Sequence, residues 1–203
     1  MKDPASGPTL EIVTMTLPNS DAKSRIDGEA PVSDLDSLYR AHARTVARWA
    51  IRLAGPEADV DDLVHEIFLV AGRRLAEFRG DAKVTTWLYR ITERVVLDGR
   101  RRSRFRRWFA STRAVEIEGR YSPPQPTPLE ALEQRQAVEA VYRILDRLPN
   151  KYRTVLILFE LEELSGEEIA ALTGLNPSTV FVQLRRARAR FLTEMKRAWG
   201  REP

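Results

Sequence analysis

The side chains of this sequence most able to bind another molecule are basic and lie in two runs. Residues 93–107 contain seven Arg against two acidic residues, and residues 183–201 contain seven Lys or Arg against one. Because the whole chain carries a net charge of only +4, the rest of it must be net acidic. One basic run is usually a solvated helix face, but two on an acidic chain indicate two contacts with a polyanion such as nucleic acid.

The sequence holds little that suggests catalysis or metal binding. It has no Cys, which excludes disulfides, thiolate metal ligands and cysteine nucleophiles. The segment HEIFL at 65–69 begins like the zinc motif H-E-x-x-H, but Leu69 stands where the second His should be, so we expect His65 on a helix surface. We therefore expect no catalytic residue, no metal and no cofactor.

Composition predicts a folded protein that acts in the cytoplasm. The chain is 43% hydrophobic and 31% charged over 203 residues, which is enough for one medium domain or two small ones. No apolar run approaches the roughly 18 residues that a membrane helix needs. The N-terminus lacks a basic start followed by an apolar stretch, so we expect neither secretion nor membrane insertion.

The second basic run follows a predicted helix-turn-helix. Ser165 and Glu168 have the spacing of a capping box, and Gly174 can end the first helix with positive φ. Asn176, followed by proline, should cap the second helix, which would enter a DNA major groove. The apolar residues expected in the small core between the two helices are Ile169, Leu172, Leu175, Val180 and Leu184.

The spacing of apolar residues elsewhere predicts helices throughout, and no segment alternates like a strand. We expect helices at about 34–54, 59–78, 84–102, 129–147 and 151–163, ahead of the helix-turn-helix. Four prolines between 123 and 128 indicate an extended linker. The predicted fold is all-α, with two helical domains. The expected parts are a flexible extension (1–32), a first domain (33–108), a linker (109–128) and a helix-turn-helix domain (129–199).

The first predicted helix has a stripe of mostly apolar residues at helical spacing. Its members are Leu35, Leu38, Tyr39, His42, Val46, Trp49 and Leu53.

Residues 61–102 resemble the promoter-melting domain of bacterial extracytoplasmic function sigma factors, which belong to the sigma-70 family. The matching motifs are the acidic helix Asp62–Phe68, the loop Phe78–Gly80, the segment Thr86–Ile91, and Asp98 followed by arginines. Residues 148–191 resemble the family's second DNA-binding domain. The resemblance implies a protein that binds core RNA polymerase, recognises the −10 and −35 promoter elements and helps to melt the DNA.

The resemblance also implies which residues make each contact. Those expected to bind polymerase are Asp61, Asp62 and Glu66, although the same carboxylates would suit a solvated helix face near the helix N-terminus. Those expected at the −10 element are Arg79, Lys83, Thr85, Thr86, Trp87, Arg90, Arg100 and Arg101. Aromatic surfaces and cations suit unstacked bases and phosphates. Phe78 and Trp87 also lie on the apolar stripe, where they would serve the core.

For the −35 element the implied contacts are Ser178, Thr179, Phe181, Gln183, Arg185, Arg186 and Arg188, with Arg190 further along toward the DNA backbone. The family often carries Lys-Ser-Arg in the middle of this helix, where the present chain has Phe181, Val182 and Gln183. An Asn common in the third helix is Arg94 here. These departures bear on which promoter sequence is recognised.

Other classes of protein also carry a helix-turn-helix. A free-standing regulator would need a dimerisation element and usually a ligand-binding or receiver domain, and the sequence offers neither. A recombinase would need a catalytic domain before the linker, whereas the first 108 residues are predicted to be purely helical. Family habit implies an anti-sigma protein as a further partner.

Overall fold

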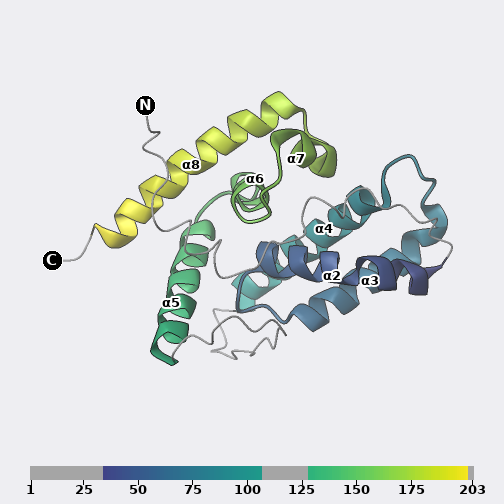
Figure 1. Ribbon diagram of the computed structural model, residues 1–203, viewed down its shortest axis with the longest axis horizontal. Coiled ribbons are helices and arrows are strands. Elements are labelled where there is room, and N and C mark those ends of the chain that lie inside the picture. The colour runs from purple at the N-terminus through teal and green to yellow at the C-terminus, as the bar shows by residue number, and fades with distance from the viewer. Residues whose placement is uncertain (1–33, 107–127, 201–203) are drawn as a thin grey trace. The chain divides into compact units, whose positions relative to one another are not determined.

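The structure, a computed structural model, describes residues 34–106 and 128–200, and every regular element within these ranges is a helix (Figure 1). The elements are α2 (Leu35–Ala54), α3 (Val60–Arg74), the short 3₁₀ helix η1 (Leu75–Glu77), α4 (Val84–Arg106), α5 (Pro128–Leu145), α6 (Asn150–Glu160), α7 (Gly166–Thr173) and α8 (Pro177–Trp199). The predicted all-α fold is confirmed. The N-terminal extension and most of the proline-rich linker lie outside the described residues.

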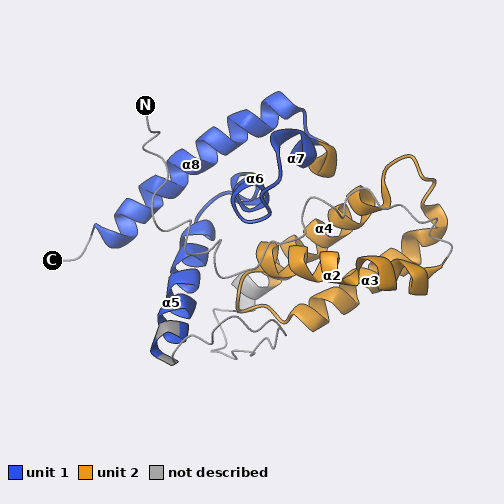
Figure 2. Cartoon of the chain, in the orientation of Figure 1, with its two compact units in different colours: residues 1–22, 117–170, 175–203 blue, residues 23–116, 171–174 orange. Residues whose placement is uncertain are grey.

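The chain divides into two compact units (Figure 2). One contains α2, α3, η1 and α4, together with residues 171–174. The other contains α5, α6, the first part of α7 and α8. Each predicted domain therefore has a helical unit as its counterpart.

Helices α2, α3 and α4 pack against one another around an apolar core. Leu38, Val46, Ile67, Leu88 and Tyr89 are completely buried there. The Tyr89 ring meets Trp49 edge to face, with 5.3 Å between ring centroids. Complete burial of large side chains from all three helices fixes the position of α3 relative to α4.

Two residues on the apolar stripe of α2 lie at the edge of the core. Leu35 and Tyr39 are 39% and 47% exposed. Leu35 covers Gly72 of α3, where a Cβ would lie 2.9 Å from its Cδ2 atom. Tyr39 packs edge to face on Phe68 at 4.8 Å between ring centroids. Both side chains therefore contact α3 from the rim, because the apolar stripe of α2 is wider than the face that its neighbours cover.

Aspartate side chains cap the N-termini of α2 and α3. The Asp34 carboxylate accepts a hydrogen bond from the Ser37 amide at 2.8 Å, and Asp59 accepts one from the Asp62 amide at 3.0 Å. Each bond satisfies a backbone N–H that the first turn of a helix leaves unpaired. The second cap orients the acidic first turn of α3.

The other unit is built on the contact between α6 and α8, with α5 also packed on α8. The buried residues of α8 recur at intervals of three and four and are Val180, Leu184, Ala187 and Phe191. Across from them, the middle of α6 is buried from Tyr152 to Leu158. Because one stripe of α8 is buried, the opposite stripe is left to solvent. No helix in the described ranges is long and apolar enough to span a lipid bilayer.

Candidate nucleic-acid interface

The turn between α7 and α8 has the capping geometry that its sequence predicts. The Ser165 amide donates to Glu168 Oε2 at 2.7 Å, and the Glu168 amide donates to Ser165 Oγ at 3.2 Å. Gly174 has φ 73°, a conformation that L side chains rarely adopt. Asn176 Oδ1 then accepts from the Ser178 amide at 3.0 Å. These local bonds determine where α8 begins and which of its side chains face outward.

The outward stripe of α8 lies opposite the buried one and carries Ser178, Val182, Arg185 and Ala189. Among the predicted −35 contacts, those exposed are Ser178, Phe181, Arg185, Arg186 and Arg188. The Ser178 hydroxyl donates to the Asn176 side chain at 2.8 Å, so the helix cap already uses that donor.

Two predicted −35 contacts are only partly accessible. Thr179 and Gln183 are half-buried. The Oε1 atom of Gln183 is buried and has no hydrogen-bond partner among the described residues. Neither side chain therefore projects freely from the helix.

A cluster of cations surrounds Tyr152 of α6. The Arg190 guanidinium lies 5.2 Å from the centroid of the Tyr152 ring, and the Lys151 ammonium lies 5.1 Å from it. A hydrogen bond from Arg186 lowers the pKa of Tyr152, nearby positive charge adds to this, and burial opposes it. These contacts bring Lys151 from α6 together with Arg186 and Arg190 from α8. Sequence reasoning missed Lys151, because no local pattern links residues so far apart in the chain.

Arg188, a predicted −35 contact, is engaged within its own unit. Its Nη2 atom lies 2.7 Å from Glu160 Oε1, and its Nε atom donates to the same oxygen at 2.8 Å. Its guanidinium also lies 4.9 Å from the centroid of the Phe159 ring. A DNA phosphate would have to displace Glu160 to pair fully with this arginine.

The predicted −10 contacts fall into three degrees of exposure. Those exposed are Arg79, Lys83, Arg90 and Arg101, and those half-buried are Thr86, Trp87 and Arg100. Thr85 is only 5% exposed, and its hydroxyl is buried. Arg100 donates to the Ala54 carbonyl at 3.3 Å, which ties α4 to the end of α2. DNA bound to this surface as it stands would therefore miss Thr85.

The two aromatic residues beside the −10 loop contact each other. The rings of Phe78 and Trp87 lie 5.0 Å apart at their centroids, with a tilt of 40° between their planes. Both residues are half-buried rather than fully buried. They therefore pack together and still leave aromatic surface accessible at the start of α4.

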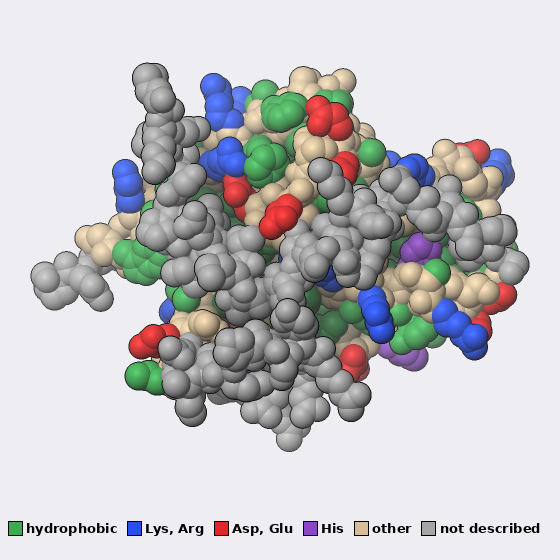
Figure 3. All heavy atoms as spheres, viewed as in Figure 1, with side chains coloured by type: hydrophobic (Ala, Val, Ile, Leu, Met, Phe, Trp, Pro, Cys, Tyr) green, Lys and Arg blue, Asp and Glu red, His purple; other side chains and the backbone are tan. Residues whose placement is uncertain are grey.

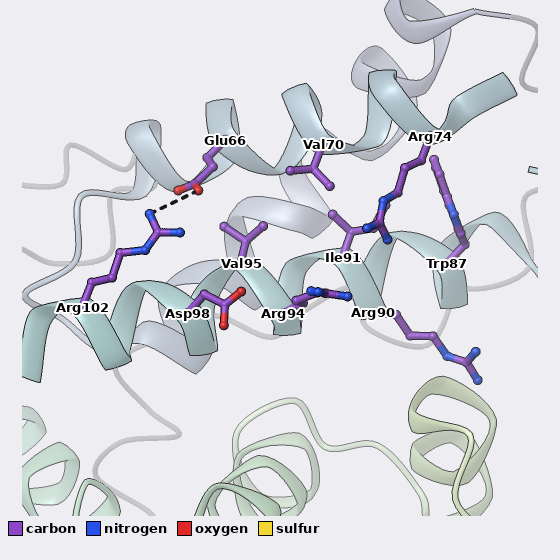
Figure 4. A pocket seen from close by; sticks show the side chains of 10 residues that line it. All are labelled: Glu66, Val70, Arg74, Trp87, Arg90, Ile91, Arg94, Val95, Asp98 and Arg102. Atoms are coloured by element: carbon purple, nitrogen blue, oxygen red, sulfur yellow. Dashed lines mark ion pairs between the residues drawn. The ribbon is translucent and has the colours of Figure 1, made fainter. Parts of the chain in front are cut away.

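A groove of about 380 Å³ lies between α3 and α4 (Figure 4). Val70, Ile91 and Val95 supply apolar surface to it. Charged residues and one aromatic residue complete its lining, namely Glu66, Arg74, Trp87, Arg90, Arg94, Asp98 and Arg102. Arg94, which stands where the family often has Asn, therefore faces this groove. Arg74 faces it too, although the sequence patterns did not single this residue out.

The acidic residues of α3 differ in their surroundings. Asp61 and Asp62 are exposed, whereas Glu66 is half-buried and faces the groove. Glu66 Oε1 lies 3.9 Å from Arg102 Nη1 of α4, and the dashed line in Figure 4 marks this ion pair. One predicted polymerase contact is thus paired with the basic run predicted to meet DNA.

The face drawn in Figure 3 has no patch of a single charge sign over the described residues. On the face shown in Figure 3, basic and acidic side chains are interspersed over the described residues.

His65 is exposed, as expected. No group of three or more His, Cys, Asp or Glu residues within the described ranges is placed to hold a metal ion.

Comparison with known families matches both halves of the chain. The family model "Sigma-70 region 2" matches residues 38–106, and "Sigma-70, region 4" matches residues 138–191. The first match covers most of α2 and all of α3, η1 and α4, and the second covers the last part of α5, all of α6 and α7, and most of α8.

Several curated relatives carry the same two regions. The chain is 34% identical over 142 residues to the ECF RNA polymerase sigma-E factor of Escherichia coli, covering 66% of this chain and 72% of the relative. It is 31% identical to the ECF RNA polymerase sigma factor SigM of Mycobacterium tuberculosis, covering 76% of this chain and 74% of that one. For SigE of Mycolicibacterium smegmatis, at 32% identity, the match covers 79% of this chain and 61% of the relative.

Solved structures share the fold. The structure described as CnrH in complex with the cytosolic domain of CnrY matches 86% of this chain and 94% of its own, with a TM-score of 0.53 and 24% identity. The sigma factor RpoE in complex with the anti-sigma factor NepR, from Bartonella quintana, matches 79% of this chain and 96% of its own, with a TM-score of 0.53 and 20% identity.

Both halves of the chain therefore point to one family, in the order in which that family carries them. The two region models match successive helical units, and relatives above 30% identity are covered over more than two thirds of their length. The chain belongs to the extracytoplasmic function sigma factors of the sigma-70 family.

Proposed function

We propose that this protein is an alternative sigma factor that binds core RNA polymerase and directs it to promoters with a −10 and a −35 element. The observation that carries the proposal is the pairing of a region 2 unit with a region 4 unit in one chain. Exposed arginines in each unit, among the residues that we propose to contact DNA, support it. Two linked contacts select a promoter better than either alone, because the second becomes intramolecular once the first has formed.

Different surfaces of the two units bind the polymerase and the two promoter elements. The α3 carboxylates Asp61, Asp62 and Glu66 dock on core polymerase. The −10 loop and the start of α4, with Arg79, Lys83 and Trp87, hold the separated strand, since aromatic and cationic surfaces suit unstacked bases and phosphates. The outward face of α8 reads the −35 duplex in the major groove. The domain boundaries proposed are 33–108 and 129–199.

The protein contributes binding rather than bond chemistry, so it is not an enzyme, and phosphodiester synthesis belongs to the polymerase. It works in the cytoplasm, where the polymerase and the promoter are found. An anti-sigma protein is a further partner, a proposal supported by the similar fold of RpoE solved with the anti-sigma factor NepR.

Transcription with purified components tests the proposal. Core polymerase with the full chain should produce run-off transcripts from a small set of promoters in a genomic library, and core polymerase alone should not. The double variant Asp62→Lys with Glu66→Lys, which alters the proposed polymerase contacts, should abolish these transcripts. It should still bind duplex DNA. If the chain instead selects an operator as a dimer, with no need for polymerase, it is a free-standing helix-turn-helix regulator.

A further inference from the structure

The outward face of helix α8 is apolar near its centre. Val182 is 45% exposed and Phe181 is 50% exposed, and the two are adjacent in the chain. Val182 lies opposite the buried stripe of the helix, four residues after Ser178 and four before Arg186. A side chain at that position is the first to meet anything that docks on the outward face. An exposed aliphatic side chain there suits an apolar feature of the docked surface.

Phe181 is held in place by a residue of the preceding helix. A Cβ built on Gly166, the first residue of α7, would lie 2.6 Å from Phe181 Cζ and 3.1 Å from both Cε atoms. The Phe181 ring therefore occupies the space that a side chain at position 166 would need, and Gly166 itself is buried. One side of the ring rests on the N-terminus of α7, and the other remains exposed beside Val182.

Cations border this apolar pair. Arg185 follows Val182 by three residues on the outward stripe and is exposed. Arg186 follows it by four residues, is exposed, and is hydrogen-bonded to Tyr152. An apolar centre next to cations matches the major groove, where the C5-methyl group of thymine is the apolar feature and phosphates border the groove on both sides.

From this arrangement we infer that Val182 and Phe181 are specificity-determining residues that read thymine methyl groups in the upstream promoter element. The inference rests on the proposed function, and it adds the base that the α8 face selects. Neither side chain can donate or accept a hydrogen bond, so the pair distinguishes thymine from cytosine and from uracil by the methyl group alone. Gly166 is a positioning residue, because any larger side chain there would push the Phe181 ring out of its place.

Thymine-to-uracil substitution tests the inference directly, because it removes the methyl group and leaves every hydrogen-bonding group unchanged. The full chain first selects its preferred sequence from a pool of duplexes randomised over about one helical turn. Each thymine of that sequence is then replaced, one at a time, by deoxyuridine, and affinity is measured by fluorescence anisotropy. At one or two positions the loss should be about threefold to fourfold, as expected for one buried methyl group.

Protein variants assign that effect to particular side chains. Val182→Ser and Phe181→Ala should each bind the thymine and uracil duplexes equally at the sensitive positions. Gly166→Ala should reproduce the loss seen with Phe181→Ala, and combining the two changes should add nothing further. Leu192→Ala, which alters another exposed apolar residue of the same helix, should keep the full preference for thymine. Thermal melting of each variant identifies any that fail to fold, and Val182→Ser leaves the Phe181 packing intact.

The outcomes separate this inference from the proposed function. If the chain selects a sequence and supports transcription but uracil replaces thymine without loss at every position, the methyl-reading role is wrong and the function stands. If methyl sensitivity persists in both Val182→Ser and Phe181→Ala, other residues read the methyl group. If Gly166→Ala leaves methyl sensitivity unchanged, Gly166 does not position the ring. If no sequence is selected and no transcript forms, the proposed function itself fails.

Discussion

Arg188 Nη2 lies 2.7 Å from Oε1 of Glu160, so an arginine predicted to contact DNA forms an ion pair with a glutamate of α6. The same guanidinium lies over the Phe159 ring. Glu160 is the more sheltered partner, with 20% of its side chain exposed against 43% for Arg188. The pair joins α6 to α8, the two helices that form the main contact of the second unit.

Arg188→Ala should therefore reduce stability more than DNA affinity. We expect a loss of about 1 kcal/mol of unfolding free energy, from a partly exposed ion pair and one cation–π contact. Urea unfolding followed by circular dichroism measures it. The matched change is Arg185→Ala on the outward stripe, which should leave unfolding unchanged and reduce the slope of log affinity against log salt by about 1. The opposite pattern would place Arg188 at the DNA backbone.

The contact between Tyr152 and Arg186 predicts a dependence of stability on pH. Because Arg186 lowers the pKa of Tyr152 below 10.0, the folded protein favours the phenolate more than the unfolded chain does. The resulting stabilisation is fully present above pH 10 and disappears as the pH falls through the lowered pKa of the folded state. Tyrosine absorbance should show one phenol that titrates early, and Tyr152→Phe should remove it. An unchanged titration in Arg186→Ala would exclude Arg186 as the cause.

The acidic turn of α3 predicts how the chain meets polymerase. Asp62→Lys with Glu66→Lys should weaken binding to core polymerase at least tenfold, because close pairs of like charge replace attractive ones. Glu133→Lys with Glu139→Lys, on exposed positions of α5, is the control of equal charge change. Affinity for core polymerase can be measured by competition with a labelled sigma factor. Equal effects of the two double variants would mean that net charge, and not the α3 surface, governs binding.

The Glu66–Arg102 ion pair makes a separate prediction. If polymerase competes with Arg102 for Glu66, then Arg102→Ala should strengthen binding to core polymerase and weaken binding to duplex DNA. Arg101→Ala is the nearest control, because Arg101 forms an ion pair with Asp98 of its own helix. It should weaken DNA binding and leave polymerase binding unchanged. Filter binding at several salt concentrations measures the affinity for duplex DNA. If Arg102→Ala weakened polymerase binding, the proposed competition for Glu66 would be wrong.

The capping box at α7 should support both stability and DNA binding. Ser165→Ala removes one of its two reciprocal hydrogen bonds and should cost about 1 kcal/mol of unfolding free energy. Because α7 supports the Phe181 ring through Gly166, this variant should also weaken binding to the selected duplex. Ser165→Asp retains a capping acceptor and should restore most of both properties. Failure of the aspartate to restore stability would show that the hydroxyl does more than cap the helix.

Much of the local structure could be predicted from the sequence, because its causes lie within a few residues of one another. The caps at Asp59, Ser165 and Asn176 each accept a hydrogen bond from an amide two or three residues away. Gly174 adopts positive φ at the turn that ends α7. The helices fall close to their predicted bounds for the same reason. Their apolar periodicity follows from the pitch of the helix and needs no knowledge of a partner.

The availability of each candidate contact residue was decided by tertiary structure. Thr85 is one of the predicted −10 contacts, yet its side chain is buried because α4 packs inward at that turn. Arg188 and Arg186 look alike in sequence, but Glu160 engages one and Tyr152 the other, across spans of 28 and 34 residues. Phe181 rests on Gly166 only because the turn folds α8 back against α7. The sequence by itself determined the family, the helices and their caps, which depend on neighbours along the chain. Packing between helices decided which side chains remain free to bind, because burial and pairing depend on residues that are distant in sequence and adjacent only after folding.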